Sequence, residues 1–144
     1  MSSINFRNTA GLFAVAATVA LAAFAGVSQA QEPAKSWQTG IHRTDLLKRD
    51  LDVSGREVVQ VLVDIDPGVS SPKHSHPGVE VAYVLEGTFE YQLEGQPPVT
   101  LKAGESLYIP AGTAHVAKNI GTGKASELAT YIVKKGVPAV ELSK

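Results

Sequence analysis

The chain alternates apolar and polar residues with a period of two from Glu57 onward. In the segment VVQVLVDID, every second residue from Val59 to Ile65 is valine or isoleucine. β-Branched residues at this period are typical of a strand, because successive side chains point to opposite faces of a sheet. We therefore predict a strand here that is buried on one face and largely buried on the other.

Further short apolar runs follow at close intervals, and turn residues such as Pro67-Gly68, Pro77-Gly78 and Gly121-Thr122-Gly123 separate them. No long segment after residue 57 has the period of a helix. Many short strands divided by Gly and Pro indicate an all-β fold, an antiparallel sandwich or barrel. The additional predicted strands are Val81–Leu85, Thr88–Leu93, Val99–Leu101, Ser106–Ile109, His115–Asn119 and Glu127–Lys134.

The first thirty residues have a different pattern. A single basic residue, Arg7, precedes an apolar stretch from Ala10 to Val27, and small residues stand at Ser28 and Ala30. This arrangement is typical of a secretory signal peptide. We predict cleavage after Ala30, which makes residues 31–144 a periplasmic or secreted protein without a membrane anchor. An uncleaved anchor is the alternative, since the apolar stretch approaches the roughly 20 residues of a membrane span.

The segment between the signal peptide and the strands is less regular. Residues 31–56 are expected to form an N-terminal linker or edge segment, and residues 57–144 the β-barrel domain. Within the former, the leucines at 46, 47 and 51 in His42–Val53 suit a helical turn and an irregular edge strand equally.

Charge and cysteine content narrow the function. The formal net charge is -1 and there is no run of basic residues, which argues against nucleic-acid binding. The chain has no cysteine, so disulfides and thiolate chemistry are excluded. Any bound transition metal then has imidazole and carboxylate ligands.

The candidate chemistry begins at the stretch HSHPGVE, which contains His74, His76 and Glu80. Residues two apart on an extended chain point to the same side, so both imidazoles can meet at one point. Taken alone, however, an H-x-H pair beside a turn also fits a solvated polar loop. His115, at the start of a later predicted strand, supplies a further ligand from a distant part of the chain, as a metal site requires. His42 stands apart and is interpreted as a surface residue.

Two stretches of the chain resemble the paired motifs of the cupin superfamily. In the first, Gly68 is followed at fixed spacings by His74, His76, Glu80 and Gly87. The second, sixteen residues later, fills every position of its pattern with Gly104, Pro110, Gly112, His115 and Asn119. The spacing resembles that of small bacterial single-domain cupins, and the fold that this resemblance implies is a double-stranded β-helix, or jelly-roll barrel.

The resemblance also implies roles for these residues. The expected ligands of one divalent transition metal are His74, His76, Glu80 and His115. Three imidazoles and one carboxylate do not decide the identity of the metal, so Mn, Fe, Co, Ni, Cu and Zn are all candidates. The glycines at 68, 87, 104 and 112 are expected at turns or close approaches of the backbone. Pro110 is expected to end a strand, and Asn119 to bond nearby backbone.

An octahedral ion with four protein ligands keeps two positions for a small molecule. By analogy with the family, we predict a metal-dependent oxidoreductase of dioxygenase type acting on a small oxygenated compound. A non-catalytic periplasmic protein that binds metal or a small ligand is one alternative, and a cupin lyase or isomerase is another. Similar cupins dimerise through their sheets, so we expect a homodimer, to which the C-terminal GVPAVELSK (residues 136–144) could add an edge strand.

Catalytic residues are harder to name from the sequence. Glu80 is a candidate base if it leaves the metal, and Tyr108 is a candidate acid or hydrogen-bond donor among four tyrosines on predicted strands. The others are Tyr83, Tyr91 and Tyr131; most tyrosines in such strands fill the core. Lys118 and Glu105 are expected to be solvated.

Overall fold

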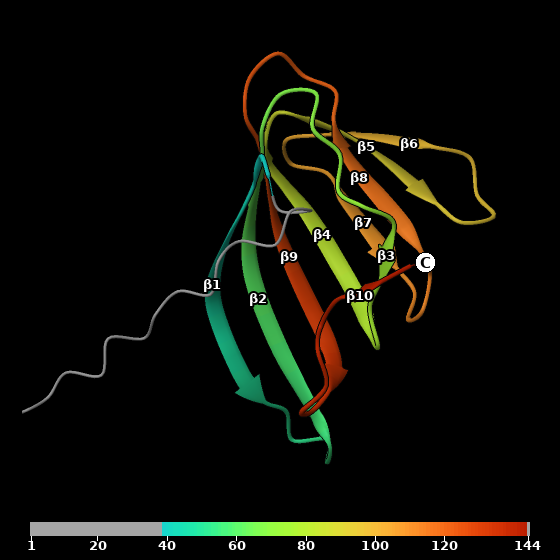
Figure 1. Ribbon diagram of the computed structural model, residues 1–144. Helices are drawn as coiled ribbons and strands as arrows, with labels where there is room; N and C mark the ends of the chain where they lie inside the picture. The colour runs from blue at the N-terminus through green and yellow to red at the C-terminus, as the bar shows by residue number, and fades with distance from the viewer. Residues whose placement is uncertain (1–38, 144) are drawn as a thin grey trace, which may run out of the picture. The chain divides into compact units, whose positions relative to one another are not determined.

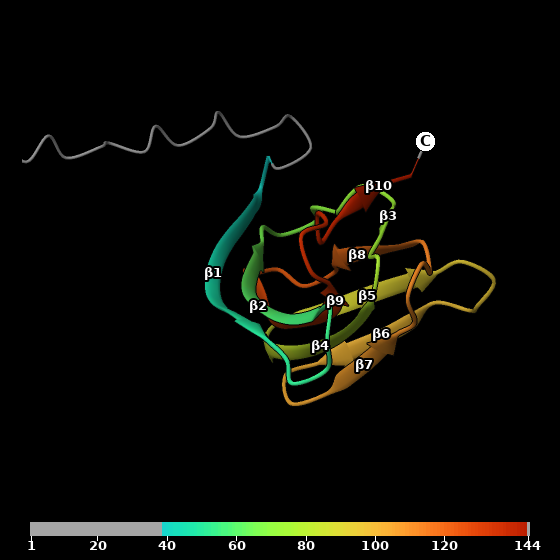
Figure 2. The ribbon, with the colours of Figure 1, turned by 90° about the horizontal axis from the view of Figure 1, so that it is seen from below.

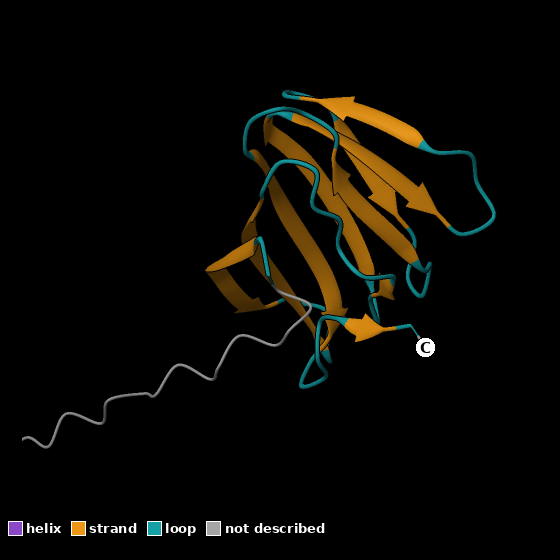
Figure 3. Ribbon diagram, turned by 45° about the horizontal axis from the view of Figure 1, so that its top comes forward, coloured by secondary structure: helices purple, strands orange, loops and turns teal. Residues whose placement is uncertain are grey.

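The computed structural model describes residues 39–143, which form two antiparallel five-stranded sheets and contain no helix (Figures 1 and 3). The predicted signal peptide and its cleavage site lie outside the described residues. The first sheet has the order β1-β2-β9-β4-β7 and the second the order β10-β3-β8-β5-β6. The bounds are β1 Ile41–Asp50, β2 Arg56–Ile65, β3 His74–Ser75, β4 Val79–Glu86, β5 Thr88–Leu93, β6 Val99–Lys102, β7 Ser106–Ile109, β8 His115–Asn119, β9 Ala125–Lys134 and β10 Glu141–Leu142.

The two sheets face each other and enclose the core (Figure 2). The inward residues of β9 show the rule: Ala125, Ala129, Tyr131 and Val133 are all buried, whereas the outward residues are more accessible, namely Leu128, Thr130, Ile132 and Lys134. β5 contributes its own alternate residues from the opposite sheet, as the period of two predicts. The prediction of an all-β fold of sandwich or barrel type is therefore confirmed.

The ambiguous segment at the start of the domain is a strand. β1 pairs with β2 along its whole length and forms one edge of the first sheet. A bulge between Asp45 and Leu47 shifts the register there. Leu46 and Leu47 are both exposed on this edge strand, and the shift interrupts the alternation of side chains, which explains why the leucine pattern in this segment did not favour a strand over a helix.

Glycines of the first motif allow the chain to turn tightly. Gly87 has φ +80°, and a Cβ atom placed on it would lie 2.7 Å from the Cβ of Ala125. A larger residue would be strained in its backbone and would collide with β9. The turn glycines at 68, 104 and 112 also have positive φ.

Asn119 ties three backbone segments together at one end of the barrel. Its side chain is fully buried and donates hydrogen bonds of 2.8 Å to the carbonyl groups of Ile65 and Gly123. Its amide oxygen accepts a bond from the N–H of Gly121. These bonds satisfy backbone groups that the strands leave unpaired.

Among the described residues, no helix is long and apolar enough to cross a membrane.

Candidate metal centre

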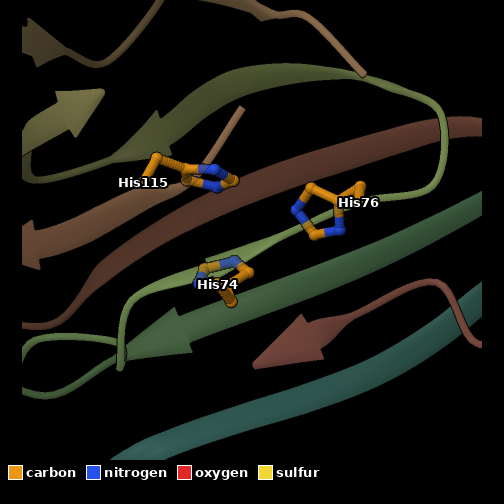
Figure 4. Close-up of side chains that lie close together, drawn as sticks. All are labelled: His74, His76 and His115. Carbon is orange, nitrogen blue, oxygen red and sulfur yellow. The ribbon is translucent and has the colours of Figure 1, made fainter. Parts of the chain in front are cut away.

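Three of the four histidines meet between the two sheets. Figure 4 shows the rings of His74, His76 and His115 turned toward one another, and one nitrogen from each lies within 4.8 Å of the others. His74 and His115 are direct partners in the register of β3 and β8. His76 follows two residues later, just after β3. Antiparallel pairing of two distant segments therefore assembles the cluster.

Each of these rings is oriented by a backbone carbonyl group. The Nδ1 atom of His74 lies 2.8 Å from the carbonyl oxygen of Pro72, and that of His115 lies 3.0 Å from the oxygen of Thr113. The Nδ1 atom of His76 lies 2.5 Å from the carbonyl oxygen of Ala139. A carbonyl oxygen can only accept, so each Nδ1 carries the hydrogen, and in the neutral form of each ring the Nε2 atom presents a lone pair. This is the arrangement in which histidines bind metals.

Glu80 completes the centre on the side of β4. Its Oε2 atom lies 2.8 Å from the Nε2 atom of His76 and 3.4 Å from that of His115. The carboxylate thus contacts two of the three rings. The carboxylate and the two rings that it contacts are each about 2% exposed, so water barely solvates their polar atoms.

The residues present fit a metal ion. The Nε2 atom of His76 and the Oε2 atom of Glu80 are fully buried, and neither makes a hydrogen bond of acceptable geometry. Two buried acceptors face each other at 2.8 Å, which is costly unless a cation or a proton lies between them. A divalent transition metal bound by imidazole nitrogen and carboxylate oxygen removes this cost.

The local electrostatics favour the metal-binding forms of His74 and Glu80, the neutral ring and the carboxylate, but they favour the protonated ring of His115. Burial and the nearby ring of His115 lower the pKa of His74 to about 4, so its ring is neutral at pH 7. Burial acts to raise the pKa of Glu80, but the contacts with His115 and His76 outweigh it and lower the pKa to about 2. Burial acts to lower the pKa of His115, and the contact with Glu80 outweighs it, so this pKa is raised.

The second motif holds the first in place. Gly112, in the turn after β7, donates its N–H to the carbonyl oxygen of His76 at 2.9 Å. The turn itself is closed by a bond from the N–H of Thr113 to the carbonyl of Pro110, which follows the last residue of β7. The backbone of His76 is therefore fixed by the same turn that orients His115.

A small cavity adjoins the centre. Its volume is about 30 Å³. A molecule held in a cavity of this size has few non-hydrogen atoms. Apolar side chains from β1, β2 and β8 form part of the wall. The polar side chains that line it, in addition to His74, Glu80 and His115, are Arg43, Ser71, Tyr91, Glu127 and Tyr131.

Two of the four tyrosines face this cavity and two do not. Tyr91 and Tyr131 are buried, and the ring of Tyr131 lies 4.6 Å from that of His76. Tyr108, the predicted acid or donor, is 59% exposed, pairs with Val81 in the register of β4 and β7, and does not line the cavity. Tyr83 is also exposed. The structure therefore does not support a catalytic role for Tyr108, because its side chain points to the outer face of the sheet.

Glu127 is the residue that the sequence reasoning missed. It is 5% exposed, and it accepts a hydrogen bond from the hydroxyl group of Tyr91 on the opposite sheet. Burial, followed by the charge of Glu80, raises the pKa of Glu127 to about 7. Its position has the same parity as Tyr131 and Val133 in a strand of period two, and this signal was available in the sequence.

The residues that the sequence predicted to lie on the surface are found away from the candidate metal centre. His42 is exposed and lies 3.7 Å from the carboxylate of Asp66, and Glu105 is exposed near the end of β6. Lys118 is half-buried on β8 and does not line the cavity.

The fold and the site together define an all-β protein with three histidines between its two sheets, placed so that they could hold a metal ion. The family model described as a cupin domain matches residues 61–133. The chain therefore belongs to the cupin family, as its two motifs predicted.

Known proteins similar to this chain include enzymes. It is 33% identical over 57 residues to the dimethylsulfoniopropionate lyase DddQ of Ruegeria pomeroyi. The aligned residues make up 40% of this chain and 28% of that protein. It is 34% identical over 74 residues to germin-like protein 1-1 of Oryza sativa subsp. japonica, 48% of this chain and 34% of that protein. The structure of a recombinant oxalate oxidase in complex with glycolate superposes with a TM-score of 0.58 and 25% identity, covering 76% of this chain and 59% of that one.

Proposed function

We propose that this protein is a metal-dependent cupin enzyme that acts on a small oxygen-bearing molecule, as an oxidoreductase of dioxygenase type. The observation that carries the proposal is the buried pair of acceptors on His76 and Glu80, with the lone pairs of His74 and His115 directed to the same place. A bound ion would supply Lewis acidity and open positions for an oxygen ligand. The chain's own residues hold the ion, exclude water and limit the size of the ligand.

A lyase is the second candidate. The carboxyl group of Glu127 lines the same cavity, and such a group can take a proton from a bound ligand without an oxidant. One relative is named as a lyase and another similar structure as an oxidase. The chain matches only 28% and 34% of the length of the two curated relatives, so their activities are not carried over as they stand.

The test begins with elemental analysis of protein purified from its native host, which identifies the ion. The metal-loaded protein is then incubated with small diketones and small carboxylates while oxygen uptake and product formation are measured. Oxygen uptake with one class supports the oxidoreductase, and product without oxygen uptake supports the lyase. A fully loaded protein that is inert toward every compound would favour the non-catalytic binding protein.

We further propose that the protein is exported and that its mature form begins at Gln31. The support is the apolar stretch before the small residues at 28 and 30. The intact mass of the protein recovered outside the cytoplasm is expected to equal that of residues 31–144. A mass that includes the first thirty residues would contradict cleavage.

A homodimer is also proposed, with a second copy against the outer face of the first sheet. This face carries the exposed apolar side chains of Val81, Tyr83, Leu85, Tyr108 and Ile132, and β4, β7 and β9 are adjacent in that sheet. Apolar surface of this kind is typical of contacts between subunits. Light scattering at micromolar concentration is expected to give twice the monomer mass, and Tyr83→Glu to shift the protein to a monomer. A monomeric wild-type protein would contradict the proposal.

A further inference from the structure

Glu127 occupies a position where a carboxyl group is unusual. It lies on the inward face of β9, in register with Val63 on β2 and Val84 on β4. Its neighbours at the same parity on β9, two residues away on each side, are Ala125 and Ala129. The surroundings are therefore those of a hydrophobic core, apart from the cavity that the side chain lines.

The burial of this group is compensated only in part, by a hydrogen bond from Tyr91 and by the charges of His115 and Arg43, which line the same cavity. Among residues 39–143, no lysine, arginine or histidine makes an ion pair with Glu127, and its hydrogen-bond partner is the hydroxyl group of Tyr91. A buried carboxylate without an ion-pair partner destabilises a fold relative to an apolar residue of similar size. Stability alone therefore does not account for a glutamate at this position.

A glutamate at this position lies beside the candidate metal centre, where it can act on a bound ligand. The cavity that Glu127 lines is also lined by His74, Glu80 and His115. Because the cavity is so small, a ligand bound through oxygen at the histidine cluster extends to the wall formed by β9 and β5. Tyr91 donates its hydrogen bond to the Oε2 atom of Glu127. That bond positions the carboxyl group and leaves its Oε1 atom for the ligand.

We propose that Glu127 is a catalytic acid–base residue that exchanges a proton with a small metal-bound ligand, one that carries a C–H bond next to a carbonyl group. This inference rests on the proposed function. In the step, the C–H bond breaks and an O–H bond forms on Glu127. The electron pair remains on the ligand as a carbon–carbon double bond, and the negative charge moves to the carbonyl oxygen. The reverse step returns the proton, so no oxidant or reductant is needed. Tyr91 is a positioning residue.

The test uses pyruvate as the probe and the Mn²⁺-loaded protein. Broadening of the pyruvate methyl resonance reports that pyruvate reaches the ion. Incubation in D₂O followed by mass spectrometry of the pyruvate reports exchange of its methyl hydrogens for deuterium. General acid–base groups contribute roughly 10² to 10⁴ in rate, so Glu127→Gln is expected to slow exchange at least about 100-fold. The variant keeps the Mn²⁺ content, the broadening and a melting temperature no lower than that of the wild type.

Two further variants separate catalysis from a structural role. Glu127→Asp keeps the charge but withdraws the carboxyl group by one methylene, and it is also expected to slow exchange. Glu86→Gln changes a carboxyl group on β4 that is 62% exposed and is expected to exchange like the wild type. A structural role for Glu127 would instead lower the melting temperature of the Gln variant without a selective loss of exchange.

The outcomes distinguish the two proposals. Equal exchange in wild type and Glu127→Gln would overturn the role of Glu127 and leave the proposed function intact. Broadening without exchange in the wild type would do the same. Absence of broadening would show that small oxo acids do not reach the ion, which would overturn the proposed function for this ligand class and the role of Glu127 with it.

Discussion

Replacing His76 with alanine is expected to abolish tight metal binding. Its Nε2 atom is one of the two buried acceptors without a hydrogen bond, and its Nδ1 atom is held by the carbonyl of Ala139. Loss of partners that only orient a ligand typically lowers metal affinity 10- to 100-fold. Removal of the ligand itself is therefore expected to lower it more than about 100-fold. Elemental analysis and competition with a chelating dye measure this directly.

The matched control is His42→Ala. This ring is 67% exposed, and its pair with Asp66 is a surface contact that contributes little. The control is expected to keep the metal content and affinity of the wild type. If His76→Ala retained an unchanged metal stoichiometry, the assignment of this centre would be wrong.

Gly78→Ala is expected to destabilise the domain by about 3 kcal/mol, the upper part of the range for overpacking. A Cβ atom on Gly78 would lie 2.0 Å from the carbonyl oxygen of Ile132 and 2.8 Å from the Cα atom of Val133. These are backbone atoms of β9, a central strand, and they cannot move without disturbing its pairing with β2 and β4. Urea denaturation of the metal-free protein gives the free energy of unfolding.

The same substitution is expected to weaken metal binding, because Gly78 lies between two predicted ligands, His76 and Glu80. Gly123→Ala is the control: a Cβ atom there meets nothing within 4 Å, and the backbone is not in the left-handed region. It is expected to be as stable as the wild type. Equal stability of the two alanine variants would contradict the close approach of Gly78 to β9.

The middle of the fold was predictable because turn residues and a period of two coincide there. β5, β7 and β8 have the predicted bounds, and β6 and β9 extend the predicted strands by one or two residues at one end. β4 extends its predicted strand by two residues at the start and by one at the end. β1 was ambiguous because its bulge interrupts the alternation. The short strand β10 was suggested only as an edge strand for a partner. In the structure it pairs with β3 of its own chain, a long-range contact that no local pattern encodes.

The candidate site also has parts that the sequence predicted and parts that it did not. The fixed spacing of the two motifs named the histidines that the structure brings together. The carbonyl group of Ala139 has no sequence signature, since any residue supplies one, and only the fold places it on His76. Gly78 was interpreted as a turn residue, although what requires glycine there is the backbone of β9. Glu127 could have been found from its parity, but a charged residue in a predicted strand suggests an outward position until the opposite sheet is known.

The contact between His76 and Ala139 also sets a sequence of events for the newly made chain. Ala139 lies near the C-terminus, and β10, which follows it, pairs with the segment that carries His74. A ribosome or a translocation pore releases the N-terminal part of the chain first, so the histidines emerge before the residues that orient them. The centre is complete only when residues 139–142 have been released and have folded back against the segment of His74 and His76. A chain interrupted before Ala139 would therefore carry all three histidines but would lack the carbonyl group that orients His76.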